Sequence, residues 1–484
     1  MIIRWVCEKC DKKWIYPVEK CIFCKGNITK QKGTKIKVVG MTKVNIPSPM
    51  HPITPYNILL LQDEFGNRIP KKTMKEYKIE DIYVEERAKT KNAVAVIKIK
   101  YDIYEAIKYS LELIGGMNFD KKDRILIKPS AVAAAYPYQA VNTNPKFIDA
   151  LLDILEEKGV KKENILVAEQ ALIGSDASDA ASKAGILEIC KKHGVGFADI
   201  SKGPFEEIES DGITLKIFKE ALHRKIINVP VMKTNFQLGI SGAVENLSRL
   251  VDESTQRKMY FEGVDNSLPN LVKLLKDVLT IADGTNGMQG QGPLALGEPA
   301  FLNLVLTSNN AANLDVVFCE TTMLPIPSHV ANSGDKVELK NIEVVGNDLD
   351  ALKYPIKQPS SNETPHSDIK VIDFKACPKC LNMLYNLSSK LVGLRGREIE
   401  VVMGSMFSAD ELKGKERIVL LGSCAIRRSE ELKMGPVAKI GEDIGDVEQL
   451  VLLKKLLTTE GTPKITNVDK VKSKITKLFS KVAK

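Results

Sequence analysis

The stretch of the chain that decides its fold is residues 92–194, where short apolar segments alternate with longer amphipathic ones. In order, these segments are NAVAVIKI (92–99), DIYEAIKYSLELI (102–114), RILIK (124–128), PKFIDALLDILEEKG (145–159), NILVAE (164–169) and SDAASKAGILEICKKHG (178–194). The short runs have the composition of buried strands, and the longer ones carry apolar residues at helical spacing. Because such alternation is typical of βαβ units, it predicts an α/β fold with a mainly parallel sheet covered by helices.

Further segments extend this pattern and set the domain boundaries. Strands are expected at 225–232, 278–283 and 302–308, and PIKQPSSNETPHSD (355–368) has the composition of a linker. The predicted organisation is a zinc ribbon at 1–30, an OB-type β-barrel at 31–90, the α/β domain at 91–355, a small cysteine-bearing α/β module at 369–453 and a basic amphipathic tail at 454–484.

Composition and charge limit the class of protein. With 484 residues, 44% hydrophobic and 27% charged, the chain has the composition of a globular protein of about three domains. No apolar run reaches the roughly 18 residues of a transmembrane helix, and no signal peptide is evident, so a cytoplasmic protein is expected. The net charge of +9 divides into +11 over 1–100, +7 over 454–484 and −9 between them. Basic ends suit an anionic ligand or partner, and a solvated lysine-rich surface is the alternative.

Four cysteines near the start of the chain have the spacing of a metal site. Cys7 and Cys10 form one CxxC pair, and Cys21 and Cys24 form a second. In a reducing compartment such pairs favour metal ligation over disulfides. Zinc prefers four soft ligands in a tetrahedron, so the two pairs complete its coordination and leave no position open for catalysis. We therefore expect a structural zinc.

The segment after the ribbon is rich in β-strand patterns and carries a resemblance. KGTKIKVVGMTKV (32–44) and TPYNILLLQDEFGNRIP (54–70) follow the paired CxxC motifs and the Tyr16–Pro17 step. Together, residues 5–88 resemble the zinc-ribbon OB-fold family called domain of unknown function 35, which accompanies thiolases and related acyl-CoA enzymes. The resemblance implies a module that docks on a thiolase-type partner or binds acyl-CoA for it.

A zinc ribbon joined to a basic barrel also suits single-stranded nucleic acid, which is a second interpretation of the same segment. It would require exposed aromatic side chains. The ribbon contains Trp5, Trp14, Tyr16 and Phe23, and most of them are expected to pack around the metal. Nucleic acid is therefore the less favoured ligand.

Residues 92–330 resemble the family called domain of unknown function 362. The matching segments are ILIKPS (125–130), TNP (143–145), INVPVMKTNFQLGISGAVENLSRL (227–250) and IADGTNGMQGQGPLALGE (281–298). The resemblance implies an α/β fold and does not imply a defined activity, since the chemistry of the family is unsettled.

Two lysines in these segments follow apolar strand patterns. Lys128 and Lys233 are therefore expected at the carboxyl ends of strands, where open α/β sheets gather their ligands. Neighbouring polar residues would help them bind a carboxylate or phosphate: Ser130, Thr143, Asn144, Thr234 and Asn235. The alternative is that these are surface lysines and helix caps.

Acid–base residues, if the protein is an enzyme, are expected among the same segments. None of the five histidines lies in a nucleophile motif. The catalytic candidates are Lys128, Lys233, Glu245 and Asp283, with Glu169 as a further acid or base.

The glycine-rich segment that begins at Gly284 predicts a tight loop. Gly287, Gly290 and Gly292 could turn backbone N–H groups toward an anion or cofactor, with Thr234 and Asn235 nearby. The segment is neither a Walker loop nor a Rossmann fingerprint, so ATP and NAD are not predicted. A chain reversal without a ligand is the alternative.

Three cysteines in the C-terminal module predict a second metal centre. Cys377 and Cys380 form a CxxC pair, and Cys424 follows a strand pattern much later. Three thiolates suit an iron–sulfur cluster, such as a 4Fe-4S cluster, with one iron open or bound by another group. Cys319 as a fourth ligand of a zinc site, and thiols without metal, are the alternatives. Cys190 lies in a helix pattern and is expected in the core.

The favoured interpretation is a metalloprotein that binds or acts on an acyl-CoA or organic acid. If it is an enzyme, the expected reaction is that of an iron–sulfur-dependent lyase or isomerase. The first alternative is a non-catalytic scaffold or electron-transfer subunit of an acyl-CoA complex. The second is a single-stranded nucleic-acid binding protein. An iron accessible to substrate would separate the first two functions.

Overall fold

The structure, a computed structural model, describes most of the chain up to Thr459. The described residues are 2–48, 54–84, 87–100, 102–172, 175–210, 213–294, 296–334, 338–359, 364–376, 378–435, 437–441 and 445–459. They form two compact units. The first unit contains the N-terminal sheets and the large sheet, and the second contains 253–267 together with the described residues after 360. Each unit is described by itself.

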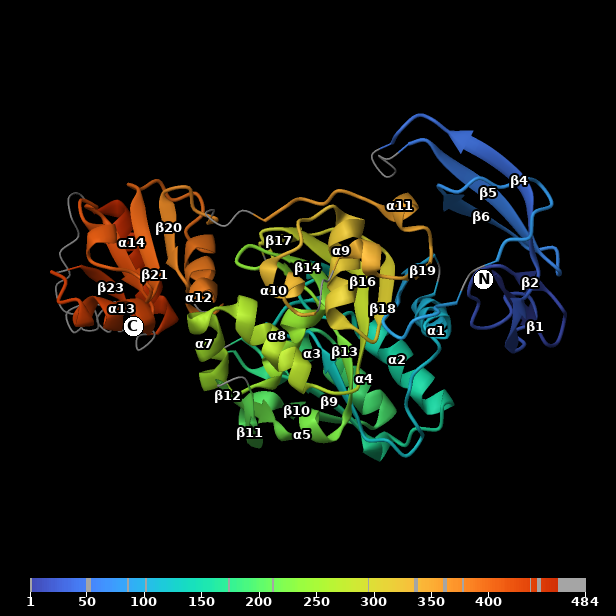
Figure 1. Cartoon of the computed structure of the whole chain (residues 1–484), viewed down its shortest axis with the longest axis horizontal. Helices are drawn as coiled ribbons and strands as arrows, with labels where there is room; N and C mark the ends of the chain where they lie inside the picture. Colours follow the sequence, from blue (N-terminus) through green and yellow to red (C-terminus); the bar gives the residue numbers. More distant parts are fainter. Residues whose placement is uncertain are drawn as a thin grey trace, which may run out of the picture. The chain divides into compact units, whose positions relative to one another are not determined.

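The first unit is built around one large sheet (Figure 1). Its main path runs β10 (Gly196–Asp199), β9 (Ile165–Glu169), β8 (Ile125–Pro129), β13 (Lys225–Val229), β16 (Val278–Gly290), β18 (Leu304–Ser308), β7 (Val94–Lys98) and β19 (Val344–Gly346). Neighbours from β10 to β16 are parallel, and β18 is antiparallel to both of its neighbours. Three short strands extend the sheet beside β16: β14 (Val231–Asn235), β15 (Gly239–Ser241) and β17 (Gly297–Pro299). The predicted mainly parallel sheet is confirmed.

Helices follow the strands as the alternation predicts. The segments after β7, β8 and β9 give α1 (Ile103–Leu113), α2 (Pro145–Glu157), α3 (Ala177–Lys183) and α4 (Ile186–His193). α2 begins at Asn144, whose side chain accepts the N–H of Lys146, and its apolar face packs into the main core with Phe147 and Leu151. The helix predicted over 178–194 is two helices, because Gly185 adopts a φ of 79° between α3 and α4.

Other elements complete the first unit. A two-stranded hairpin, β11 (Phe205–Ser210) and β12 (Ile213–Phe218), precedes α5 (Lys219–His223). The remaining helices are α6 (Ala243–Leu247), α9 (Ala311–Thr322), α10 (Ser328–Ala331) and α11 (Leu349–Leu352). α8 (Val264–Leu274), which belongs to this unit from Leu268 onward, leads into β16. The strand expected over 225–232 is in fact two strands, since the chain leaves β13 at Pro230 and continues as β14.

The N-terminal region contains two antiparallel three-stranded sheets. β1 (Ile2–Cys7) pairs with β2 (Lys13–Trp14) and β3 (Ile28–Gly33), and β5 (Tyr56–Asp63) pairs with β4 (Ile36–Val44) and β6 (Arg68–Thr73). A further bridge joins Lys37 to Ile82 along the outer edge of β4. The predicted β-rich segment is confirmed, and its closure into an OB-type barrel stays a prediction.

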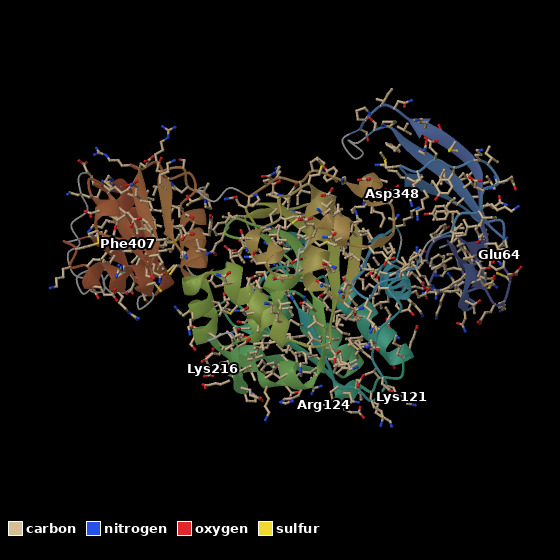
Figure 2. The ribbon with its side chains drawn as sticks, viewed as in Figure 1. Glu64, Lys121, Arg124, Lys216, Asp348 and Phe407 are labelled. Carbon is tan, nitrogen blue, oxygen red and sulfur yellow. The ribbon has the colours of Figure 1, made fainter. Side chains whose placement is uncertain are left out.

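Polar contacts join these small sheets to the α/β part of the first unit. Lys30 Nζ lies 2.7 Å from the Glu105 carboxylate on α1. Asp348, labelled in Figure 2, accepts hydrogen bonds from Thr73 Oγ1 at 3.0 Å and from the N–H of Met74 at 2.9 Å. The end of β6 is thereby held against the residue that precedes α11.

The second unit contains a four-stranded parallel sheet. Its order is β20 (Ile369–Phe374), β21 (Ile399–Gly404), β22 (Ile418–Leu421) and β23 (Ala438–Ile440). α12 (Pro378–Ser389), α13 (Ser423–Glu431) and α14 (Asp446–Thr458) follow its strands, and α7 (Glu253–Glu262) belongs to the same unit. A parallel sheet with helices is thus present where the small α/β module is expected, and the bounds 369–453 stay a prediction. The basic tail predicted over 454–484 lies outside the described residues beyond Thr459.

Helices long and apolar enough to span a membrane are absent from the described part of the chain.

Candidate functional site

The four N-terminal cysteines lie on two turns of the same form. In the first turn the N–H of Asp11 donates to the Cys7 carbonyl at 3.0 Å, and in the second the N–H of Lys25 donates to the Cys21 carbonyl at 2.9 Å. Asp11 and Lys25 both have positive φ angles, of 53° and 58°. The repeated geometry is that of two metal-binding knuckles that face each other.

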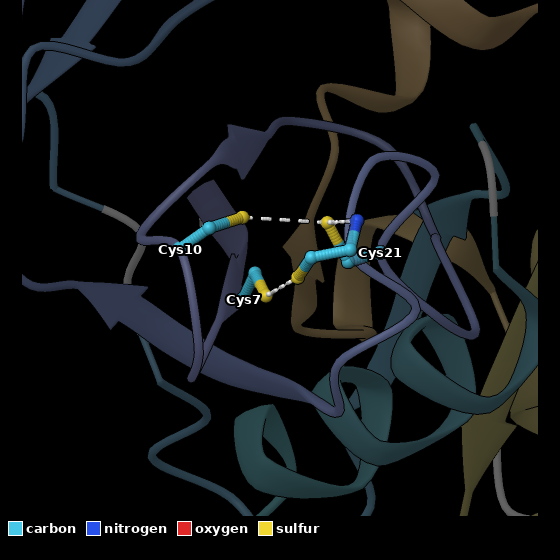
Figure 3. Close-up of side chains that lie close together, drawn as sticks. Cys7, Cys10 and Cys21 are labelled. Carbon is cyan, nitrogen blue, oxygen red and sulfur yellow. Dashed lines mark hydrogen bonds between the residues drawn. The ribbon is translucent and has the colours of Figure 1, made fainter.

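The sulfur atoms of these cysteines form one cluster (Figure 3). All four lie within 4.8 Å of one another, with Cys7 Sγ 3.4 Å from Cys24 Sγ and Cys10 Sγ 3.5 Å from Cys21 Sγ. Sulfurs bound at about 2.3 Å to a tetrahedral ion are roughly 3.8 Å apart, so the donor set fits a single metal. The four-cysteine cluster can therefore bind a metal such as zinc.

The surroundings of Cys21 favour its metal-binding form. Burial opposes ionisation of the Cys21 thiol, but hydrogen bonds from the backbone N–H groups of Cys24 and Phe23 outweigh it and lower the pKa to about 6. The thiolate is the species that binds metal, so Cys21 is the thiol that ionises readily, while burial and the neighbouring thiols raise the pKa of Cys10 and of Cys24.

The ribbon aromatics divide into a buried and an exposed pair. Trp5 and Trp14 are 5% and 8% exposed and pack with Cys7 and Cys21. Tyr16 and Phe23 are 50% and 65% exposed. The expectation that most of these rings pack around the metal therefore holds for the two tryptophans only.

The large sheet carries a buried ion pair at the carboxyl ends of two neighbouring strands. Lys128 is the penultimate residue of β8, Glu169 is the last residue of β9, and Lys128 Nζ lies 2.6 Å from Glu169 Oε1 with both side chains 0% exposed. Burial lowers the pKa of Lys128, and attraction to Glu169 opposes this shift. The alternative that Lys128 is a surface lysine is wrong.

Lys233 lies in the same region on β14 and is buried without an ion pair among the residues that the structure describes. Its side chain is 3% exposed, and its Nζ donates to the Val141 carbonyl at 2.8 Å and to Ser130 Oγ at 3.2 Å. Burial lowers its pKa to about 8, although the charges of Glu245 and Glu169 act to raise it. The third N–H of the ammonium group has no hydrogen bond within the described residues.

Asp283 is a third buried titratable group on this edge. Its carboxylate accepts hydrogen bonds from the N–H of Asn144 at 2.8 Å, from the N–H of Thr285 at 2.9 Å and from the Thr285 hydroxyl at 2.6 Å. Burial raises its pKa, against these hydrogen bonds. The N–H of Thr143 donates to the Ser130 carbonyl at 2.7 Å, and the N–H of Ser130 donates to Thr143 Oγ1 at 2.8 Å. Since Asn144 contacts Asp283 and Val141 contacts Lys233, the segment 141–144 connects these two side chains.

Sequence reasoning missed the polar network behind these residues. Asn246 Nδ2 donates to Asn228 Oδ1 at 2.8 Å, and Lys128 Nζ donates to Asn246 Oδ1 at 3.4 Å. Asn228 is a polar residue inside the otherwise apolar run IINV (226–229), which is the signal that could have revealed it. Glu245, the predicted catalytic residue on α6, is half-buried beside this network.

The first turn of α6 is held by a third buried acid. Asp315 on α9 accepts the N–H of Ala243 at 2.6 Å and of Val244 at 2.9 Å, and burial raises its pKa to about 7. A Cβ atom on Gly242 would lie 2.1 Å from Asp315 Oδ1, so only glycine fits at this contact. The cap fixes α6, and with it Glu245 and Asn246.

Thr234 and Asn235, which are predicted to bind a cofactor, are the last two residues of β14. Asn235 Oδ1 accepts the N–H groups of Gln237 and Leu238 at 2.8 and 3.0 Å, so it shapes the turn between β14 and β15. Thr234 is fully buried in β14. Their role in binding a cofactor stays a prediction.

The glycine-rich segment is a strand and not the predicted loop as far as Gly290. β16 continues through it, and its carbonyl groups at Gly287 and Asn286 accept the N–H groups of Ala300 and Leu302 at 3.1 and 3.0 Å. The N–H of Gly290 itself donates to the Lys357 carbonyl at 2.9 Å. The predicted tight loop is therefore wrong as far as Gly290, because this backbone pairs within the sheet, while the binding of an anion or cofactor by Gly287, Gly290 and Gly292 stays a prediction. Gly292, which follows the strand, would place a Cβ 2.2 Å from the Thr234 carbonyl oxygen.

Cys380 and Cys424, the described cysteines of the C-terminal module, both lie on helices that follow strands of its parallel sheet. Cys380 is buried in the first turn of α12, which follows β20, and Cys424 lies in the first turn of α13, which follows β22. Cys377 lies outside the described residues, so the predicted three-cysteine centre stays a prediction. Cys319 is buried in α9 of the first unit. Cys190 is 2% exposed in the main core, as expected.

These features define an α/β protein with a buried charged site on a mainly parallel sheet and a four-cysteine cluster near its start. Residues 125–320 match the family described as Domain of unknown function (DUF362), and Lys128, Glu169, Lys233 and Asp283 lie within that domain. The chain is 27% identical over 228 residues to "Thylakoid-associated protein sll1697" of Synechocystis sp., a match that covers 45% of this chain and 70% of that protein. A solved structure, "Ltp2-ChsH2(DUF35) aldolase", matches with 15% identity and a TM-score of 0.16, over 18% of this chain and 73% of that one.

Proposed function

We propose that the chain is a metalloprotein that binds or acts on an organic acid or acyl-CoA at the carboxyl edge of its large sheet. In this proposal the N-terminal cluster holds a structural zinc, and a thiolase-type enzyme is the partner. Lys128, Lys233, Glu245 and Asp283 form the ligand site.

The observation that carries the proposal is the burial of Lys233 without an ion pair among the described residues. Burying an ammonium group without a counter-charge is costly. Nearby Glu169 is already paired with Lys128 at 2.6 Å, and Glu245 attracts Lys233 without forming an ion pair with it, so neither carboxylate fully neutralises the second cation. A carboxylate ligand would supply the missing negative charge and accept the remaining N–H of the ammonium.

The same groups suit acid–base chemistry on such a ligand. Lys233, with a pKa of about 8, has a neutral fraction near neutral pH and can accept a proton. Asp283 has a raised pKa and lies beside the segment that also contacts Lys233. A base and an acid whose pKa values are shifted toward neutrality are what proton transfer next to a carbonyl requires.

The proposed partner rests on the N-terminal region. Residues 5–88 resemble the family called domain of unknown function 35, which accompanies thiolases and related acyl-CoA enzymes. A closed four-cysteine cluster has no coordination position for a substrate. The ribbon in this proposal therefore stabilises a docking module, and the ligand chemistry belongs to the large sheet.

The test is titration calorimetry of the purified full chain with acetyl-CoA and with acetate. We expect Lys233→Met to weaken binding of the responding ligand by about tenfold or more, because a charge-assisted hydrogen bond is lost. Lys146→Met is the matched control, since Lys146 is exposed on α2 near the site.

Equal affinity in wild-type protein and Lys233→Met would contradict the proposed site. Absence of binding by both ligands to the folded, zinc-loaded chain would contradict the ligand class. A circular dichroism melt shows that each variant is folded before its affinity is interpreted.

A further inference from the structure

The first unit contains a cavity of about 130 Å³ that the proposed function does not use. Its walls come from β1, β4, β5 and β6 of the N-terminal sheets on one side, and from β7 and α1 on the other. All of these elements belong to one unit, so the cavity is defined within a single compact body.

The cavity is mainly apolar and has the size of a small ring. Most of its lining side chains are hydrophobic, and three of them, Ile2, Trp5 and Leu61, are at most 5% exposed. Its volume is close to the roughly 150 Å³ of an apolar cavity that binds benzene in another protein. There is therefore room for a body of about six carbon atoms.

One polar side chain on the cavity wall lacks half of its hydrogen bonds. Glu105 lies in the first turn of α1 and is 8% exposed. Its Oε1 accepts a hydrogen bond from Lys30 Nζ at 2.7 Å. Its Oε2 is buried and has no hydrogen-bond partner among the residues that the structure describes. A buried carboxylate oxygen without a donor is costly, so this atom calls for one.

The helix itself does not supply the missing donor. A glutamate three residues after the N-cap of a helix often accepts the N–H of the N-cap residue. The N-cap of α1 is Asp102, whose side chain accepts the N–H of Tyr104 at 2.9 Å. Within the described residues Glu105 makes no bond back to Asp102. Because Glu105 lines the cavity, a ligand there can supply the donor.

The surrounding charges favour a donor without charge. Three lysines and two acids line the cavity: Lys71, Lys98, Lys100, Asp102 and Glu105. A fourth lysine, on β3, pairs with Glu105, so positive charge is in excess here. A cationic donor would add to that excess. A carboxylate brings no proton for Oε2 and would be repelled by it, whereas a hydroxyl group meets both conditions.

We propose that this cavity binds a small uncharged hydroxyl compound with an apolar body of about six carbon atoms. Its O–H group donates to Glu105 Oε2, and its carbon atoms lie against Trp5 and Ile97. The proposal does not depend on the proposed function of the large sheet, because it uses none of the same residues.

The experiment is titration of the full chain with cyclohexanol and, separately, with 1-hexanol. Cyclohexanone and 2-hexanone are the matched compounds, since they keep the carbon body and lack the O–H donor. Calorimetry measures the affinities. Fluorescence gives a second reading, because Trp5 lines the cavity and is one of two tryptophans in the chain. We expect at least one alcohol to bind, about tenfold more tightly than its ketone.

Glu105→Met tests the assigned acceptor. It should weaken alcohol binding by about tenfold and leave ketone binding unchanged, because only the alcohol uses the carboxylate. Glu112→Met is the matched control and should bind as wild type. Glu112 also lies on α1 and pairs with a lysine of β3, Lys32, at 2.7 Å, but it does not line the cavity.

Failure of both alcohols to bind overturns the proposal, as does equal affinity for each alcohol and its ketone. Unchanged alcohol affinity in Glu105→Met overturns the role of Glu105. Tighter binding of cyclohexylammonium or cyclohexanecarboxylate than of cyclohexanol overturns the uncharged class of ligand. If Glu105→Met does not fold, the comparison of alcohol with ketone in wild-type protein still decides.

Discussion

At the scale of single residues, burial distinguishes the two site lysines from the other lysines of this basic chain. The sequence places Lys128 and Lys233 after apolar runs, but it does not show that both are removed from water. Lys128 is compensated by Glu169 at 2.6 Å, whereas Lys233 has only neutral acceptors in its described hydrogen bonds. Lys233 therefore makes folding sensitive to pH in a direction that can be worked out.

The first prediction concerns that pH dependence. The pKa of Lys233 is about 8 in the folded chain and 10.5 ordinarily, so between these values the unfolded chain binds more protons. Stability therefore rises with pH in this window, and the cost of burying the charge is fully present below it. Relative to Lys233→Met, wild-type protein should gain roughly 3 kcal/mol in free energy of unfolding from about pH 7 to about pH 10.5.

Urea unfolding of both proteins across this pH range measures the difference. Taking the difference removes the titration of all other groups, which the two proteins share. A difference that stays constant with pH would show that Lys233 keeps its ordinary pKa, and the argument for a poised base would then fail.

At the scale of elements, β16 explains why the glycine-rich segment is conspicuous in the sequence. Glycines there permit close approach between strands. A Cβ on Gly284 would lie 2.7 Å from Met232 Sδ and 2.8 Å from the Leu304 carbonyl oxygen. The sulfur can move, but the carbonyl belongs to β18, which pairs with β16 at this position. Gly284 is thus required by packing in the sheet.

The second prediction follows from this contact. Gly284→Ala should lower the free energy of unfolding by about 1–3 kcal/mol through overpacking. Gly196→Ala is the control on the same sheet, because its nearest contact, Leu166 Cδ1 at 3.5 Å, is an ordinary one and its φ is not positive. Chemical denaturation gives both values. Equal stability of the two variants would mean that β16 has room for a side chain at Gly284.

How far the sequence predicts the structure can be judged from these elements. Alternating apolar and amphipathic segments suffice for β7 to α4, because each segment is buried on the side that its pattern indicates. The same reasoning failed at the glycine-rich segment, since glycine permits both a loop and a tightly packed strand. It also missed Asn228 and Asn246, whose partners come from segments distant in sequence.

At the scale of the whole molecule, the cysteines predicted to bind metal form two sets, whose described members belong to different units. Cys7, Cys10, Cys21 and Cys24 lie in the first unit, and Cys380 and Cys424 lie in the second. The spacing of the first set was sufficient to predict its convergence, because each CxxC turn positions its own pair. Convergence of the second set depends on how two helix starts meet at a sheet edge, which spacing alone does not determine.

The last prediction is that the two sets bind metal independently. In anaerobically purified protein, Cys21→Ser should lose about one zinc per chain and leave iron and acid-labile sulfide unchanged, because the thiolates of each site belong to one unit. Cys424→Ser should keep the zinc and lose iron and sulfide, since a cluster held by three cysteines depends on each of them. Cys190→Ala, which removes a core thiol, should change neither metal. Elemental and sulfide analysis of the four proteins measures these contents. Wild-type protein with no metal beyond one zinc would exclude the C-terminal centre, and unaltered zinc in Cys21→Ser would exclude the ribbon site.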